Sequence, residues 1–178
     1  MNLKTKTLID ISLLAAITAV LSQIAVPLPF TLVPINLATL GVFLCGALLG
    51  AKYGALTQIV YILLGVIGLP VFSGFSGGAG VLFGPTGGYI IGYIFAALCT
   101  GLFIKKLPKK FSYYTLSMFI GLVVCYLFGT AWFIYLTKAT FRKALAACII
   151  PFIPGDILKI IAASFIAIRL KKTPFFSN

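Results

Sequence analysis

The stretch PFIPGDILKIIAASFIAIRL, residues 151–170, decides the fold of this chain. A membrane-spanning helix needs about 20 predominantly apolar residues, and this stretch is long and apolar enough to be one. It nevertheless contains two opposite charges, Asp156 and Lys159. A charged side chain at the centre of a membrane helix costs roughly 2.5–3.5 kcal/mol. Because the two residues are three positions apart, they share one helix face and can pair. We therefore predict that they belong to a functional site inside a membrane protein.

The composition of the whole chain also indicates a membrane protein. Of its 178 residues, 61% are hydrophobic and 9% are charged, and the mean hydropathy is +1.17. Soluble domains contain about 25% charged residues. The length allows roughly six spans and leaves no room for a soluble catalytic or nucleotide-binding domain. The net charge of +12 does not indicate nucleic-acid binding, because the basic residues lie at the ends of apolar runs.

Six apolar segments predict an all-α integral membrane protein with six transmembrane helices in a single domain, residues 1–178. Their approximate bounds are 8–26, 35–50, 53–69, 84–104, 112–136 and 147–168. A cytoplasmic N terminus would place these ten basic residues on the cytoplasmic side: Lys4, Lys6, Lys52, Lys105, Lys106, Lys109, Lys110, Arg169, Lys171 and Lys172. The opposite side would carry Lys138, Arg142 and Lys143. This bias predicts that both termini are cytoplasmic.

The last segment is interrupted near its outer end. Pro151 and Pro154 obstruct a continuous helix, and the sequence Pro-Gly-Asp is typical of a helix start, with Asp156 near the N-cap. From there to Arg169 the helix is roughly 20–22 Å long at 1.5 Å per residue, whereas the hydrocarbon core is about 30 Å thick. With Arg169 at the inner surface, the charged pair lies in the outer half of the membrane, at the positive end of a broken helix. Transporters bind substrate groups at such ends.

The chemistry of the pair suits a small polar ligand. A carboxylate accepts hydrogen bonds from N–H groups, while an ammonium donates three and neutralises an anion. Asp156 and Lys159 together fit a ligand that has amide-like N–H groups and a carboxylate. The alternative is a structural ion pair that ties two helices together. We favour the ligand, since charges inside a membrane tend to mark substrate pathways.

Further candidate residues gather near the predicted outer side. The stretch 69–89 contains seven glycines and neither lysine nor arginine. This composition disfavours a phosphate loop and favours a tight, neutral cap over a pocket, although small residues also permit close helix packing. Aromatic residues here predict an apolar cavity wall or, alternatively, an interfacial belt. The candidate ligand contacts beside the charged pair are Asn36, Tyr89, Thr86, Phe30, Phe72 and Tyr93. Gln58, nearer the other side, is expected to bond across helices.

A small-residue ridge in the first span predicts close helix packing. Ala15 and Ala19 are one turn apart and are flanked by Ser12 and Ala16. Such a ridge lets another helix approach closely. It serves either packing within the chain or docking of another membrane subunit.

Catalysis has little support in the sequence. The chain contains no histidine, which is the commonest general base and metal ligand. The four cysteines lack metal-site spacing, so we interpret them as free thiols and expect no metal or cofactor. Asp10 and Asp156 are predicted near opposite faces, which disfavours a paired-carboxylate protease. Uphill transport would therefore take its energy from an ion gradient or a partner. A stand-alone secondary transporter or channel stays an alternative, although no internal repeat is visible.

Four segments of the chain resemble signature segments of the BioY family. They are VPINLATLGVFLCGALLG at 33–50, GLPVF at 68–72, GPTGGY at 84–89 and PGDILK at 154–159. BioY proteins are the biotin-binding S components of energy-coupling factor (ECF) transporters. The resemblance covers essentially the whole chain. It implies the six-helix S-component fold in a prokaryotic plasma membrane, with biotin bound near the extracellular face.

The resemblance also implies partners and residue roles. A transmembrane T subunit and two ATPase subunits would energise uptake, and the loaded subunit would topple in the membrane to release biotin inward. Asp156 and Lys159 match the acidic–basic pair of the family and would contact biotin. Ala15 and Ala19 match the small-residue motif that docks onto the T subunit. An S component for another vitamin is the alternative within this fold.

The second span departs from the family pattern. This chain has VPINLAT where family members usually have VPITLQT, so Asn36 replaces a threonine and Ala38 replaces a glutamine. Any role of that glutamine is therefore lost here or has moved to Asn36.

Overall fold

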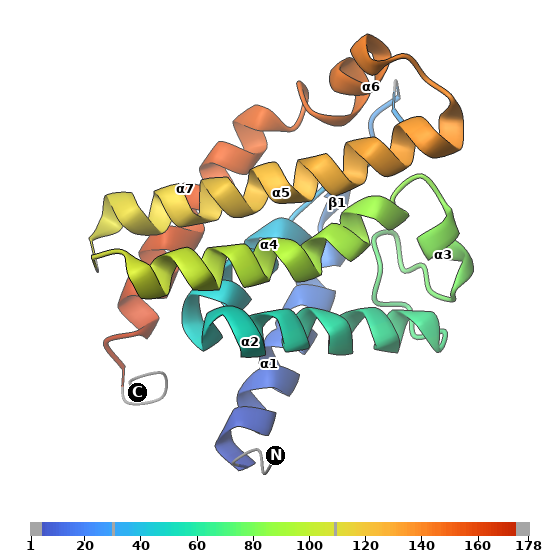
Figure 1. The fold of residues 1–178 in the computed structure, drawn as a ribbon. Helices are drawn as coiled ribbons and strands as arrows, with labels where there is room; N and C mark the ends of the chain where they lie inside the picture. Colours follow the sequence, from blue (N-terminus) through green and yellow to red (C-terminus); the bar gives the residue numbers. More distant parts are fainter. Residues whose placement is uncertain (1–4, 30, 109, 174–178) are drawn as a thin grey trace.

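The computed structural model describes residues 5–29, 31–108 and 110–173, and it is a helical bundle (Figure 1). Its elements in chain order are α1 (Thr5–Gln23), β1 (Ala25–Val26), β2 (Ile35–Asn36), α2 (Ala38–Val66), α3 (Gly80–Phe83), α4 (Gly87–Lys106), α5 (Phe111–Thr137), α6 (Phe141–Cys148) and α7 (Ile153–Leu170). Each predicted span coincides with helix over most of its length. The helical class predicted from the sequence is confirmed.

Helix α2 is a hairpin of two helical halves. Gly50 interrupts it with φ 75° and ψ −178°, a left-handed conformation that glycine adopts without steric cost. Gln58 Nε2 donates to Cys45 Sγ at 3.1 Å, whereas 13 residues of continuous helix would separate these positions by about 20 Å. The chain therefore folds back at Gly50. The sequence predicted this break at residues 51–52, and the predicted bond of Gln58 across helices is confirmed.

Four of the described helices, α1, α2, α4 and α5, are long and apolar enough to cross a membrane. Helices α6 and α7 meet at a bend of 49° and make a fifth candidate if they form one broken span. This number takes α2 as one helix, although its two halves lie against each other.

The polar connection predicted at 137–143 is wrong at its end, because α6 begins at Phe141. This short helix is amphipathic. Ala144 and Cys148 are buried in the core, while Arg142 and Lys143 are exposed. The all-α prediction also missed β1 and β2, which pair antiparallel with Ala25 opposite Asn36.

The start of α7 agrees closely with the sequence interpretation. The helix begins at Ile153, after the break between α6 and α7, and Pro154 lies in its first turn, where proline is tolerated because no intrahelical N–H is needed. Asp156 lies in that first turn rather than at the N-cap, which is Phe152. The first turn of α7 therefore carries a buried acid, since Asp156 is 2% exposed.

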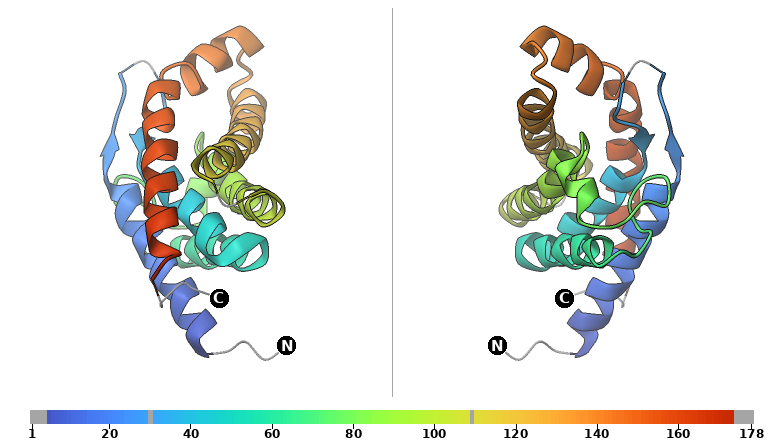
Figure 2. Two further views of the ribbon diagram at one scale, coloured as in Figure 1. Left: turned by 90° about the vertical axis from the view of Figure 1, so that its left-hand side faces the viewer. Right: turned by 90° about the vertical axis from the view of Figure 1, so that its right-hand side faces the viewer.

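The arrangement of the helices gives the bundle two distinct ends. α4 lies between α2 and α5 (Figure 1). Both further views show α1 beginning and α7 ending toward one end, with α6 at the other (Figure 2). Gly46 permits close packing of α2 on α4, since a Cβ there would lie 2.4 Å from the Ala97 carbonyl oxygen. The end that carries α6 is where the candidate site lies.

Candidate functional site

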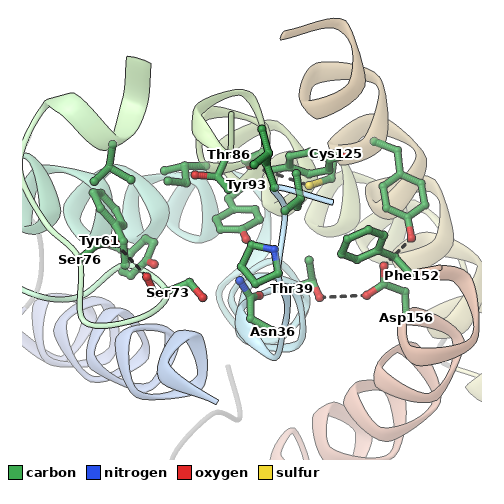
Figure 3. A pocket seen from close by; sticks show the side chains of 18 of the residues that line it. Asn36, Thr39, Tyr61, Ser73, Ser76, Thr86, Tyr93, Cys125, Phe152 and Asp156 are labelled. Atoms are coloured by element: carbon green, nitrogen blue, oxygen red, sulfur yellow. Dashed lines mark hydrogen bonds between the residues drawn. The ribbon is translucent and has the colours of Figure 1, made fainter. Parts of the chain in front are cut away.

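A cavity of about 240 Å³ lies at the end of the bundle opposite the start of α1 and the end of α7. Its residues come from the β2–α2 junction, the loop after α2, α4, α5 and the start of α7 (Figure 3). Seven of the eight predicted ligand contacts line it: Asn36, Phe72, Thr86, Tyr89, Tyr93, Asp156 and Lys159. Phe30 lies outside the described residues. The structure therefore brings together residues that are far apart in the sequence.

The charged pair is the polar centre of this cavity. Lys159 Nζ lies 2.7 Å from Asp156 Oδ1, and the two side chains are 6% and 2% exposed. Thr39 of α2 donates its hydroxyl to the same carboxylate oxygen at 3.3 Å and accepts from Lys159 Nζ at 3.3 Å. Tyr126 of α5 donates to Asp156 Oδ2. The cluster therefore joins α2, α5 and α7 around one buried carboxylate.

The hydrogen-bonding capacity of the cluster is not exhausted. A carboxylate offers about four acceptor positions and a lysine ammonium three donors. Among the described residues, Asp156 accepts two bonds on Oδ1 and one on Oδ2, while Lys159 Nζ donates two. One acceptor position on Oδ2 and one donor on Nζ are left for a ligand. A neighbouring N–H and C=O, as in an amide or a urea, would match this arrangement.

Aromatic rings form much of the cavity wall. Phe72, 1% exposed, meets Tyr61 edge to face with ring centroids 5.6 Å apart, an arrangement that aromatic pairs favour. Tyr61 donates its hydroxyl to the Val71 carbonyl at 3.1 Å. Gly65 makes room for Phe72, because a Cβ at Gly65 would lie 2.0 Å from the ring. The loop after α2 thus inserts one ring into the bundle and holds it there.

Tyr89 and Tyr93, on one face of α4, supply the opposite wall. The Tyr89 hydroxyl donates to the Cys148 carbonyl at 2.9 Å, which ties α4 to the end of α6. Gly129 of α5 accommodates the Tyr89 ring, since a Cβ there would lie 2.4 Å from it. Both tyrosines are buried, at 8% and 5% exposure. Most of the cavity surface is therefore apolar, apart from the hydroxyls and the charged cluster.

Asn36 and Thr86 lie at helix starts beside the cavity. Asn36 Oδ1 accepts from the backbone N–H of Ala38 at 3.1 Å, so its carbonyl group stabilises the first turn of α2. Thr86 is the N-cap residue of α4. Figure 3 shows Asn36 and Thr39 between the Ser73–Ser76 side and the Asp156 side of the cavity. This position fits a contact role for the Asn36 amide nitrogen.

Sequence reasoning missed several lining residues. Thr39 and Tyr126 bond directly to Asp156, and Ser73, Ser76, Cys125 and Phe152 also line the cavity. Thr39 carried a usable signal, because it is a polar residue one turn from Asn36 in an apolar run. Tyr126 carried none, since the polar residues of α5 are not gathered on one face of the helix.

The end of α1 clamps the loop that carries Phe72. Gln23 Nε2 donates to the carbonyls of Pro70 and Phe72 at 3.3 and 3.1 Å, and Gln23 Oε1 accepts from the N–H of Phe75 at 2.8 Å. Ser22 donates to the Val71 carbonyl. Phe75 has φ 55°, which is unusual for a residue with a side chain. These bonds fix one cavity wall to the first helix.

The alanine ridge of α1 faces inward. Ala15 is 1% exposed and belongs to the core, and Ala19 is partly buried against it. The prediction that Ala15 docks another subunit does not agree with this burial, because its methyl group already packs within the chain. Ser12 and Ala16, which flank the ridge, are exposed. Ala15 therefore packs within the chain, one of the two roles expected from the sequence, while docking of another subunit through the partly buried Ala19 stays a prediction.

Comparisons with known proteins identify the relatives of this chain. The sequence model of the BioY family matches residues 1–174. The chain is 40% identical over 167 residues to the biotin transporter BioY of Thermotoga maritima, and the aligned region covers 94% of this chain and 96% of that protein. It is 39% identical to a probable biotin transporter BioY of Pyrococcus horikoshii, with 95% and 98% covered. Its structure is similar to a crystal structure of the S-component for biotin from an ECF-type ABC transporter, with a TM-score of 0.91, 31% identity, and 98% and 97% covered.

Proposed function

The chain belongs to the BioY family, and from this premise we propose that it is the biotin-binding S component of an ECF-type importer. Its structural relative with 31% identity is an S-component for biotin from an ECF-type ABC transporter. The observation that carries the proposal in this chain is the buried Asp156–Lys159 cluster, which opens onto an aromatic cavity. Such a site suits a ligand that is mostly apolar and has one compact polar edge.

Biotin has this shape and polarity. Its ureido ring presents N–H groups beside a carbonyl, its thiophane ring is apolar, and a flexible chain carries its carboxylate. We assign one ureido N–H to the remaining acceptor position on Asp156 Oδ2. The ureido oxygen accepts from Lys159 Nζ. The apolar ring then lies against Phe72, Tyr89 and Tyr93, while Asn36 and Thr86 remain available to the polar edge or the chain.

The helix arrangement and the charge bias support the topology that we propose. Counting the two halves of α2 separately, and α6 with α7 as one broken span, gives six passes. Both termini then lie in the cytoplasm, since the end of the bundle where α1 begins and α7 ends carries most of the basic residues. The biotin cavity opens toward the extracellular face of a prokaryotic plasma membrane. Extracellular labelling of single-cysteine variants tests this orientation.

The partners would be a transmembrane T subunit and two ATPase subunits. No nucleotide-binding motif is visible in the sequence, so ATP hydrolysis is assigned to them. Because Ala15 is buried, the exposed side of α1, which includes Ser12 and Ala16, would contact the T subunit. Toppling of the loaded subunit against this partner would carry biotin inward.

Two measurements test the function. The purified chain should release biotin on denaturation, identified by mass spectrometry, and titration calorimetry should give tight binding to biotin and none to thiamine or riboflavin. Tight binding of another vitamin would identify a different S component. Biotin uptake into liposomes by the purified chain alone would indicate a stand-alone transporter instead.

A further inference from the structure

A second hollow lies at the end of the bundle where α7 ends, away from the biotin cavity. It has a volume of about 500 Å³. The residues that line it come from the hairpin turn of α2, the end of α4, the start of α5 and the end of α7. Lys105, Lys171 and Lys172 line it, together with Tyr114. Lysines from the ends of two helices therefore border one cleft.

Local backbone geometry explains why a cleft forms here. Gly50, with φ 75°, turns the chain between the halves of α2, and no atom lies within 4 Å of where its Cβ would be. Gly101 of α4 packs against this turn, because a Cβ there would lie 2.2 Å from the Ala51 nitrogen. The glycine turn thus leaves space and exposes main chain beside it. Tyr114, 3% exposed, closes the cleft from α5.

The charge of the cleft favours an anionic ligand. Neither of the two acidic residues of the sequence, Asp10 and Asp156, is among the described residues that line the cleft. Lys171 Nζ lies 5.5 Å from the centroid of the Tyr114 ring, which holds one cation at the cleft wall. Basic residues at helix C termini also complement the helix dipole, but that effect does not direct them toward a shared hollow.

We propose that this cleft binds the phosphate of an anionic phospholipid at the cytoplasmic surface of the membrane. The assignment of the surface rests on the proposed topology. Basic pockets between helices on this side of a membrane bind phosphate headgroups, and a lysine ammonium donates three hydrogen bonds to such an oxygen cluster. The adjoining apolar residues, Leu48, Ile104 and Ile168, lie where acyl chains would begin. Phospholipids and small phosphate esters both carry this group, and we assign the phosphate in the cleft to a phospholipid.

The test compares two double variants of equal charge. Lys105→Gln with Lys172→Gln removes two cleft cations, while Lys106→Gln with Lys110→Gln removes two exposed cations that do not line the cleft. Binding of phosphatidylglycerol, phosphatidylcholine and glycerol phosphate to the full chain is measured by native mass spectrometry. The cleft variant should lose about tenfold or more in phosphatidylglycerol affinity, since it loses charge-assisted hydrogen bonds to the phosphate that the control variant keeps. The control should stay within about twofold.

Three outcomes would overturn the proposal. Equal losses of phosphatidylglycerol affinity in both variants would indicate that surface charge alone attracts the lipid. Unchanged phosphatidylglycerol affinity in the cleft variant would exclude the site. Binding of glycerol phosphate as tight as that of phosphatidylglycerol would exclude a lipid as the source. Biotin titrations of both variants separate this result from the proposed function, because none of the four lysines lines the biotin cavity.

Discussion

Removing the charge of Asp156 while leaving its shape tests what the buried pair does. In Asp156→Asn, the ammonium of Lys159 loses the carboxylate at 2.7 Å but stays 6% exposed. Breaking a buried ion pair by removing one partner costs about 3–5 kcal/mol, because it leaves an uncompensated charge. At about 2–4 °C per kcal/mol for a chain of this size, the melting temperature should fall by about 6–20 °C.

The double variant Asp156→Asn with Lys159→Met separates stability from binding. Methionine fills the volume of the lysine stem without a charge, and replacing a whole buried pair is often neutral for stability. The melting temperature should therefore recover. Biotin affinity should not, since the ureido group loses charge-assisted hydrogen bonds worth about 2–3 kcal/mol, which corresponds to roughly 30–150-fold in the dissociation constant.

The assay is titration calorimetry on purified protein, paired with thermal unfolding of the same samples. Lys106→Met, an exposed lysine at the other end of the bundle, is the matched control and should change neither quantity. A double variant that folds normally and binds biotin with the wild-type dissociation constant would refute the reasoning. The pair would then be a structural tie between helices.

Three further substitutions test the surroundings of the pair. Tyr126→Phe removes one donor to Asp156 and should weaken biotin binding by about tenfold, as loss of a bond to a charged group implies; an unchanged calorimetric titration would contradict this. Gly65→Ala places a methyl group 2.0 Å from the Phe72 ring, so the ring must move; we expect a loss of about 1–3 kcal/mol in stability from overpacking, visible in thermal unfolding, and an unaltered melting temperature would count against it. Gln23→Ala removes three bonds to the loop after α2 and should speed hydrogen exchange there and biotin dissociation, whereas equal exchange in both proteins would argue against the clamp.

The sequence located the charged pair and the break in the last span because both depend on local chemistry. Proline interrupts a continuous helix in any fold, so Pro154 indicated a helix break from the sequence alone. A charged residue in an apolar run can likewise be recognised without knowledge of the fold. The sequence also indicated the hairpin, as a very short turn at residues 51–52 between two apolar runs, directly after Gly50. These features needed no tertiary information.

Orientation of apolar helices could not be predicted in the same way. In a membrane, the lipid-facing and core-facing sides of a helix are both apolar. The sequence of α1 therefore could not decide whether Ala15 faces the core of the chain or a partner, and that of α5 did not indicate that Tyr126 reaches Asp156. Helix α6 was missed for a different reason. Arg142 and Lys143 resembled a polar loop, although Ala144 and Cys148 have the spacing of a buried helix face.

The structure changes the physical account of why two charges are stable at this depth. The sequence favoured a polar ligand as the group that completes their bonding, with a structural ion pair as the alternative. In the structure, Asp156 and Lys159 already bond to each other, to Thr39 and, through the carboxylate, to Tyr126. Most of the cost of burying the charges is therefore offset before any ligand arrives. A ligand then adds one accepted and one donated hydrogen bond to a fixed frame, without ordering the side chains or stripping water from bare ions. Selectivity follows from the same frame: an analogue that fills the cavity but lacks the adjacent N–H would leave the last acceptor position on Asp156 buried and unpaired, which is costly.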